Sequence, residues 1–457
     1  MDQTQRIDPN KTQMTPGPGD DPMRTQAMGA MSDPNRTAAM GSLRGLTAEV
    51  VPGRTASMAN GPAREQFLLE FHGAGEAMPG MGGGSRTALN LCLVIDRSGS
   101  MEGPPLEYVK QACCHVVDLL SPNDILSIVT FEEVVDVLMP PQRVTNKQPI
   151  KDGIQRLMAG NTTDLHGGIM LGAAQVAQVG EPGRSTRLVV FSDGDPTTGV
   201  KDFHALVSAA GDIKARGVTI TFLGFGPDYN EELLASMAKK AGGNYYYIQS
   251  PELIPEVFRT ELDKMMTAVA RNLKLELKLA RWVTLRGAHA QMGAPGDREL
   301  TIELADLERG AHLQQVIDLE FQNHPLGHYR VASGRLTYDD MVTGKNEVVD
   351  LDFVLEFTSD TARFSAPQDP RVRQAADVLL ASRAVEKTIM GLKTQQLSPQ
   401  AAVAELQKTQ ALLLQEGRTA EAQEVTQALR AIQSGDQGTA EKTLIGTMLH
   451  LDQGKHS

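Results

Sequence analysis

Carboxylate and hydroxyl side chains gather directly after an apolar run of this 457-residue chain. Leu89 to Ile95 is a buried-type run, and Asp96-Arg97-Ser98-Gly99-Ser100 follows it. An Asp and two hydroxyls at alternating positions beyond a strand's carboxyl end can point at one centre. Open α/β sheets hold their ligands at this edge. The spacing therefore predicts a ligand site formed by Asp96, Ser98 and Ser100.

Two later stretches carry the same kinds of side chain. Gly160-Asn161-Thr162-Thr163-Asp164-Leu165 lies just before a predicted helix, and Phe191-Ser192-Asp193-Gly194-Asp195 follows another predicted strand. These stretches offer oxygen donors and no Cys, and His166 is interpreted as a helix-surface residue. Hard oxygen ligands suit Mg²⁺, Mn²⁺ or Ca²⁺ rather than Zn²⁺.

Together these stretches resemble the metal-ion-dependent adhesion site of von Willebrand factor A domains. The matching positions are Asp96, Ser98, Ser100, Thr163 and Asp193. Thr162 is the alternative to Thr163. The resemblance covers about residues 88–268. The wider layout is loosely similar to bacterial cytoplasmic relatives of inter-alpha-trypsin-inhibitor heavy chains.

This resemblance implies a non-catalytic protein-interaction module that depends on a divalent cation. It implies that the three hydroxyls bind the ion directly and the Asp residues partly through water. Mg²⁺ is the expected ion, with Mn²⁺ or Ca²⁺ as alternatives. The implied partner is a protein that supplies a Glu or Asp carboxylate to the ion. We therefore expect a docking site in which the metal joins two proteins.

The alternative is a Mg²⁺-dependent hydrolase or transferase that uses Asp96 and Asp193. Against an enzyme, Asp96-Arg97-Ser98 lacks the second Asp of the phosphatase D-x-D motif. No G-x-x-x-x-G-K-[ST] phosphate loop occurs. Gly224-Phe225-Gly226 has Tyr229 where a dinucleotide fingerprint requires a third Gly. We expect no catalysis.

Composition excludes several kinds of partner. The formal net charge of −12 disfavours a nucleic-acid binder and a polybasic membrane contact. No run approaches the roughly 20 apolar residues of a membrane-spanning helix. The chain has three cysteines, too few for a disulfide framework. The first ten residues are polar and lack an apolar signal core. These features predict a cytoplasmic protein.

Strands and helices alternate between residues 88 and 268, which predicts a doubly wound, mostly parallel α/β sheet. From 269 to 366, segments such as Leu273–Leu279 alternate apolar and polar residues, as β-sandwich strands do. The isolated strand at 65–72 fits the same sandwich, with the α/β domain inserted. After residue 367 helix formers dominate. We predict a helical bundle with Val403, Leu406, Leu413 and Leu414 facing inward.

The predicted domain boundaries follow from these patterns. They are a disordered tail (1–63), a sandwich strand and Gly-rich hinge (64–87), a von Willebrand factor A domain (88–268), a β-sandwich (269–366) and a helical domain (367–457).

The tail repeats a short motif. Asp8-Pro9-Asn10-Lys11-Thr12 recurs at Asp21–Thr25 and Asp33–Thr37, with a weaker copy at Val51–Thr55, and a Met follows each Thr. Slippage of a low-complexity tail is one explanation. The other is a scaffold function, with Thr12, Thr25, Thr37 and Thr55 as targets of a bacterial Ser/Thr kinase. A forkhead-associated-type domain would then read the phosphothreonines.

Overall fold

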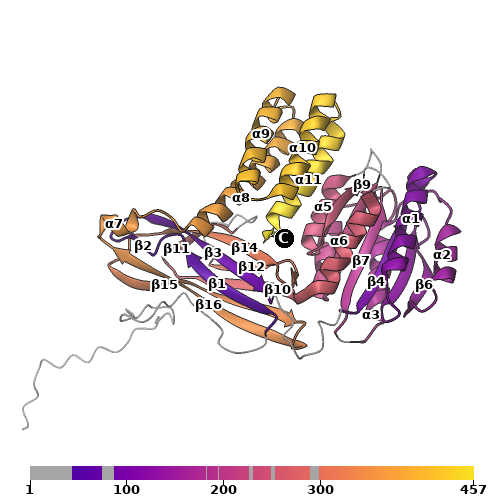
Figure 1. The fold of residues 1–457 in the computed structure, drawn as a ribbon, viewed down its shortest axis with the longest axis horizontal. Coiled ribbons are helices and arrows are strands. Elements are labelled where there is room, and N and C mark those ends of the chain that lie inside the picture. The colour runs from indigo at the N-terminus through magenta and orange to yellow at the C-terminus, as the bar shows by residue number, and fades with distance from the viewer. Residues whose placement is uncertain are drawn as a thin grey trace, which may run out of the picture.

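The computed structural model describes residues 44–74, 87–181, 183–193, 195–225, 230–248, 253–288 and 298–456. It contains a β-sandwich, an α/β domain and a bundle of C-terminal helices, which lie at the left, at the right and above the two in Figure 1. The α/β domain is inserted between two strands of the sandwich, as the sequence predicts.

Two mainly antiparallel sheets form the sandwich. One contains β1 (Leu46–Pro52), β3 (Ala63–Gly73), β14 (His312–Phe321) and β11 (Val283–Ala288), with β17 (Lys455–His456) paired to β14. The other contains β12 (Glu299–Glu303), β10 (Ala268–Leu279), β15 (Gly327–Asp340), β16 (Lys345–Thr358) and β2 (Ala56–Met58), with β13 (Leu307–Glu308) beside β10. The alternating side chains of these strands supply one shared apolar core.

The prediction of a disordered tail is wrong for residues 44–63. β1 pairs antiparallel with β3 along its whole length, and β2 pairs in parallel with the end of β16. Val51, in the weaker repeat copy, is buried outside the shared sandwich core, in a small cluster with Leu68 and Val316. Thr55 is exposed in the bend between β1 and β2. Thr12, Thr25 and Thr37 lie outside the described residues.

The α/β domain is built on a six-stranded sheet. The strand order is β6 (Asp136–Arg143), β5 (Ile125–Phe131), β4 (Leu89–Asp96), β7 (Ser185–Ser192), β8 (Thr219–Phe225) and β9 (Tyr245–Ile248). All neighbouring pairs are parallel except β5 and β6. Every residue of β4 is buried because helices cover both faces of the sheet.

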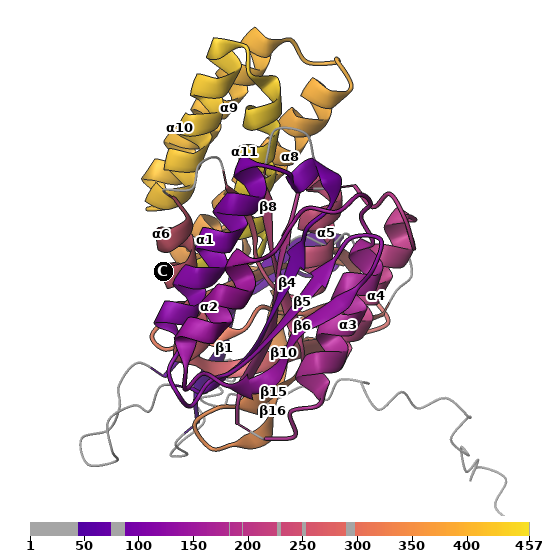
Figure 2. The ribbon, with the colours of Figure 1, turned by 90° about the vertical axis from the view of Figure 1, so that its right-hand side faces the viewer.

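Helices from two groups make these covers, as Figure 2 shows. On one face lie α1 (Pro104–Leu119), α2 (Lys147–Gln155) and α6 (Ile254–Thr267). On the other face lie α3 (Leu165–Ala177), α4 (Phe203–Ala215) and α5 (Glu231–Lys240). A short 3₁₀ turn, η1 (Gly99–Met101), follows β4. Helix α6 runs directly into β10, which returns the chain to the sandwich.

The C-terminal helices connect the other two parts. After the short α7 (Thr361–Phe364) come α8 (Pro370–Lys393), α9 (Pro399–Gln415), α10 (Thr419–Ser434) and α11 (Gln437–Asp452). The first turns of α8 place Val372 and Ala375 on the sandwich. Leu406 and Leu413 face inward as predicted and Val403 is partly buried, but Leu414 is 53% exposed. The apolar core of the bundle is continuous with that under α3, α4 and α5.

Buried charges join the α/β domain to the sandwich. Arg187 of β7 donates to Glu261 of α6 at 2.6 Å and to Asp306, between β12 and β13, at 3.3 Å. Glu261 also accepts from Thr221, at 2.7 Å. Burial alone would raise the pKa of Glu261, but Arg187 and the surrounding donors outweigh it and lower the pKa to about 2. This network makes the domain junction depend on ionised carboxylates.

Candidate metal centre

Asp96 ends the central strand of the α/β sheet, where the chain changes direction. From β4 the chain goes through α1 to β5 on one side, and it reaches β7 on the other side only later. Such a switch point leaves an opening beyond the strand ends, because the two connections diverge there. Asp96 lies in register with Phe131 of β5, and Ile95 lies in register with Phe191 of β7. The residues after Phe191 therefore meet Asp96 at this edge.

The predicted oxygen ligands from the first and third stretches form one hydrogen-bonded cluster. Ser98 Oγ lies 3.1 Å from Ser100 Oγ, and Ser100 Oγ donates to Asp193 Oδ1 at 3.0 Å. Asp96 Oδ1 accepts from the Ser98 amide at 2.9 Å. Only Ser100 of these four is exposed. The cluster therefore faces solvent through Ser100.

Backbone contacts bring the middle stretch to the same edge. The Gly160 amide donates to the Arg97 carbonyl at 2.6 Å, and the Gly99 amide donates to the Asn161 carbonyl at 3.2 Å. Glu132 supports this join because its carboxylate accepts from the Arg97 side chain and from the Asn161 amide. The loop that carries Thr162 and Thr163 is thereby fixed against the loop that carries Ser98 and Ser100.

Thr163 also contacts the loop that follows β7. Its amide donates to Thr197 Oγ1 at 2.8 Å, and its carbonyl accepts from the Thr197 amide at 3.0 Å. The Thr163 side chain is 3% exposed. The Thr162 hydroxyl is buried without a hydrogen-bond partner among the described residues. A buried hydroxyl without a partner is costly, so Thr162 stays a candidate beside Thr163.

Two acidic neighbours have other positions. Asp164 caps α3 by accepting from the Gly167 amide at 2.9 Å, which is the role of a helix N-cap. Asp195 is exposed. Ser192, which the sequence interpretation did not single out, donates to Asp96 Oδ2 at 2.6 Å. Its place at the last position of β7, one residue before Asp193, is the signal that could have identified it.

The electrostatics of the cluster favour a cation. Burial, the largest cause, and the neighbouring Asp193 raise the pKa of Asp96 to about 7, against the lowering effect of hydrogen bonds from Ser192 and Ser98. Burial also raises the pKa of Asp193. Both shifts report a cost of holding negative charge here. A bound cation would remove that cost.

The donor set and its spacing fit a hard divalent ion. Ligands at 2.0–2.1 Å around an octahedral Mg²⁺ are separated from their neighbours by about 3.0 Å. The two oxygen pairs Ser98–Ser100 and Ser100–Asp193 have separations of 3.1 and 3.0 Å. Within the described residues, no group of three or more His, Cys, Asp or Glu side chains is arranged to hold a metal. Oxygens from hydroxyls thus have to complete any shell around Asp96 and Asp193.

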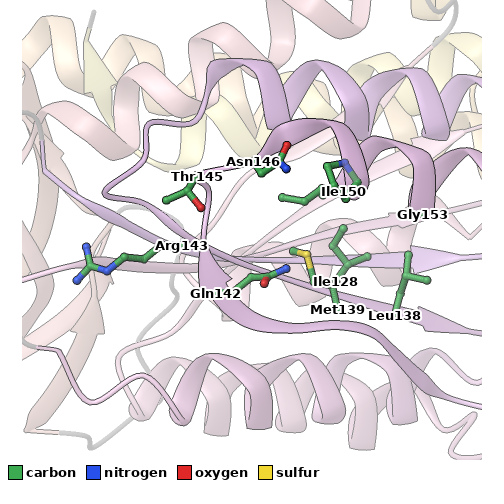
Figure 3. A pocket seen from close by; sticks show the side chains of 10 residues that line it. Ile128, Leu138, Met139, Gln142, Arg143, Thr145, Asn146, Ile150 and Gly153 are labelled. Carbon is green, nitrogen blue, oxygen red and sulfur yellow. The ribbon is translucent and has the colours of Figure 1, made fainter.

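A separate hollow of about 280 Å³ lies at the edge of the α/β domain, between β5, β6 and α2 (Figure 3). Ile128, Met139 and Ile150 supply its apolar wall, and Gln142, Arg143 and Asn146 contribute polar groups. None of the candidate metal ligands lines it.

The comparison with known proteins identifies the inserted α/β domain. Residues 90–260 match the family model of the von Willebrand factor type A domain. The chain contains a von Willebrand factor A domain. Domains of this family commonly serve as metal-dependent protein-interaction modules.

Relatives that share the von Willebrand factor A domain match different fractions of this chain. An uncharacterized protein of Synechocystis sp. is 30% identical over 276 residues, which are 58% of this chain and 64% of that protein. The inter-alpha-trypsin inhibitor heavy chain H1 of Mesocricetus auratus is 29% identical over 162 residues, or 34% of this chain and 18% of the heavy chain. The match thus spans less than two thirds of each relative.

A solved structure shares the wider architecture. The von Willebrand factor type A protein from Catenulispora acidiphila superposes with a TM-score of 0.67 at 16% identity, over 84% of this chain and 89% of that chain. This likeness extends the shared fold well beyond the von Willebrand factor A domain. No helix in the described part of the chain is long and apolar enough to cross a membrane.

Proposed function

We propose that the von Willebrand factor A domain binds Mg²⁺ through Asp96, Ser98, Ser100, Thr163 and Asp193. The observation that carries this proposal is the cluster of Ser98, Ser100 and Asp193 oxygens at separations of about 3 Å. In this proposal the chain is a non-catalytic, cytoplasmic interaction module. Mn²⁺ and Ca²⁺ are the alternative ions.

The residues of the site divide the work. Ser98, Ser100 and Thr163 supply neutral hydroxyls, so only two formal negative charges face the cation. The Ser192 hydroxyl and the Ser98 amide orient the Asp96 carboxylate, because each donates a hydrogen bond to one of its two oxygens. When bound, the cation supplies an open coordination position for a Glu or Asp carboxylate of a partner protein. The exposed Ser100 marks the side from which that carboxylate approaches.

Calorimetric titration of Mg²⁺ and Mn²⁺ into the full chain tests the site. Asp96→Ala should abolish binding. Asp195→Ala is the matched control, because Asp195 is an exposed carboxylate two residues from Asp193. It should leave binding within about twofold, since solvent and salt screen the charge of an exposed carboxylate. Equal binding by wild type and Asp96→Ala would contradict the proposed site.

The alternative of a Mg²⁺-dependent hydrolase or transferase uses the same two carboxylates. A screen of phosphate-ester and glycoside substrates with Mg²⁺ separates the two functions. Turnover by the wild type that is lost in Asp96→Ala and retained in Asp195→Ala would favour the enzyme. We expect no turnover by the wild type or by either variant.

The scaffold function remains part of the proposal. Thr12, Thr25, Thr37 and Thr55 are the proposed kinase targets, with a forkhead-associated-type domain as reader. Incubation with a bacterial Ser/Thr kinase and mass spectrometry tests them. Thr55 should react more slowly than the others, because the Arg54 side chain already donates to Glu65 and to the Ala366 carbonyl.

A further inference from the structure

We infer that the Asp-Pro repeats of the N-terminal tail are ligands of the chain's own metal site. This inference rests on the proposed function, because it assigns the carboxylate that completes the site. Asp8, Asp21 and Asp33 each precede a Pro and stand three residues before Lys11, Arg24 and Arg36. One repeat would occupy the site at a time.

Charge around the site selects a particular kind of ligand. Beyond the proposed ligands, Glu102 and Asp195 are exposed within two residues of Ser100 and Asp193. Arg97 is the only Lys or Arg within three residues of any proposed ligand, and it pairs with Glu132 at 3.1 Å. This acidic rim repels a segment with several carboxylates. It favours a single carboxylate that has a basic residue nearby.

Apolar side chains lie on one side of the same edge. Val134 is 54% exposed and Met158 is 77% exposed. They belong to neighbouring loops, since a Cβ on Gly160 would lie 2.4 Å from Glu132 Oε2. Glu132 and Gly160 both contact Arg97, so these two loops border the loop that carries Ser98 and Ser100. A ligand that carries an apolar residue near its carboxylate fits them.

Each of the three Asp-bearing repeats has a carboxylate, a basic residue and an apolar residue, as the site requires. After the Asp and the basic residue comes a Thr, and Met14, Met28 and Met40 follow within three residues of it. The Pro after each Asp favours an extended backbone at the Asp, which leaves its carboxylate free of local helical contacts. Met is a flexible side chain that adapts to irregular apolar surfaces.

The fourth copy of the repeat supports the assignment because it lacks the Asp that would bind the metal. It has Val51 in place of the Asp, and Val51 packs between the sandwich sheet and α8, against Val372 and Ala375. The copy without a carboxylate is therefore folded into the sandwich. The three copies with a carboxylate all precede the first described residue.

The tail is long enough to reach the site. A Cβ on Gly45 would lie 2.6 Å from the Val269 carbonyl, two residues beyond α6, and the Thr87 amide contacts the Met266 carbonyl. Gly45, next to the first described residue, thus lies near the start of β4. The eight residues of β4 span about 26 Å from there to Asp96. Asp21 precedes Arg44 by 23 residues, which can span at most about 80 Å.

The test uses the full chain with Asp8, Asp21 and Asp33 all replaced by Asn, so that its own tail offers no repeat carboxylate. The probe is a terminally blocked synthetic peptide of residues 30–42, which contains Asp33 as its only acidic residue. Calorimetry in Mg²⁺ should detect peptide binding. The same peptide with Asp33→Asn should bind at least about tenfold more weakly, a difference of one charge-assisted contact.

Wild-type chain is the second arm of the experiment. Its intact tail competes at an effective concentration of the order of millimolar, so it should bind the peptide at least about tenfold more weakly than the triple variant. Equal affinity of both chains would show that the tail does not occupy the site. If the triple variant binds Mg²⁺ but not the peptide, the inference is wrong and the metal site stands. If the triple variant fails to bind Mg²⁺ as well, the proposed function fails.

Discussion

Ser192 donates its hydroxyl to Asp96 Oδ2 at 2.6 Å across the ends of two neighbouring strands. The contact lies within the sheet's edge, where Asp96 is fully buried. The hydrogen bond orients the carboxylate but does not offset the full cost of burying its negative charge. The candidate site therefore holds a charge whose natural complement is a cation.

This arrangement predicts a trade between stability and metal binding. The raised pKa of Asp96, about 7, means that the metal-free protein loses stability as the pH rises from about 4 through 7. Asp96→Asn keeps the shape and carries no charge. At pH 8 without metal it should be more stable by roughly 1 kcal/mol, or about 2–4 °C in the melting temperature. Adding Mg²⁺ should raise the melting temperature of the wild type only. A variant that is stabilised by Mg²⁺ to the same extent would contradict the role of Asp96.

The two adjacent threonines can be separated by one substitution each. Thr→Val removes the hydroxyl and nearly preserves the volume. Thr163→Val should weaken Mg²⁺ binding by about tenfold or more, the effect of one lost oxygen ligand. Thr162→Val should leave Mg²⁺ affinity unchanged and slightly raise the melting temperature, because its buried hydroxyl has no partner among the described residues. The reverse pattern would assign the ligand to Thr162.

The junction between the domains should be acid-sensitive. Because the folded-state pKa of Glu261 is lowered to about 2, its contribution is fully present above about 4.5 and is lost as the pH falls towards 2. Thermal unfolding should show a steep loss of melting temperature between pH 5 and 3. Glu261→Gln should be less stable at pH 7, because the buried Arg187 would lose one of its two carboxylate partners and keep only Asp306. Its melting temperature should then vary less between pH 5 and 3; an unchanged slope would contradict this assignment.

Phosphorylation of the tail should oppose its binding to the metal site. A phosphothreonine adds a charge of about −1.5 to −2 next to the basic residue of the repeat. The acidic rim formed by Glu102 and Asp195 would repel it. We expect the 30–42 peptide with phosphorylated Thr37 to bind the triple Asp→Asn chain about tenfold more weakly than the unmodified peptide. Equal binding would show that the rim does not sense the phosphate, and the kinase would then have to act through the reader domain alone.

Local patterns in the sequence were sufficient for the α/β domain. The apolar run of β4 and the polar residues that follow it reveal both the strand and the edge at which Asp96 lies, because strand ends in a parallel sheet meet at one edge. The caps are similarly local. Asp164 caps α3, and Gly435 ends α10 with a positive φ that glycine adopts without strain.

Other features depend on contacts between distant segments. The exposure of Leu414 could not be predicted from the sequence. Its helix is apolar on several sides, and the packing of the other helices decides which side is buried. Residues 46–58 look like tail by composition, yet they fold because β3 and β16 offer open edges for pairing. The partner of β2 lies far along the chain in β16, and such a partner leaves no local signal.

The sequence by itself determined the fold class, the inserted order of the parts and the oxygen chemistry of the candidate site, since these depend on residue type and short-range spacing. Only the tertiary structure decided that Ser192 holds Asp96, that Glu132 fixes the threonine loop, and that Glu261 and Asp306 share Arg187. The physical reason is the same in each case. Hydrogen bonds and buried ion pairs form between groups that folding brings within about 3 Å, whatever their separation along the chain.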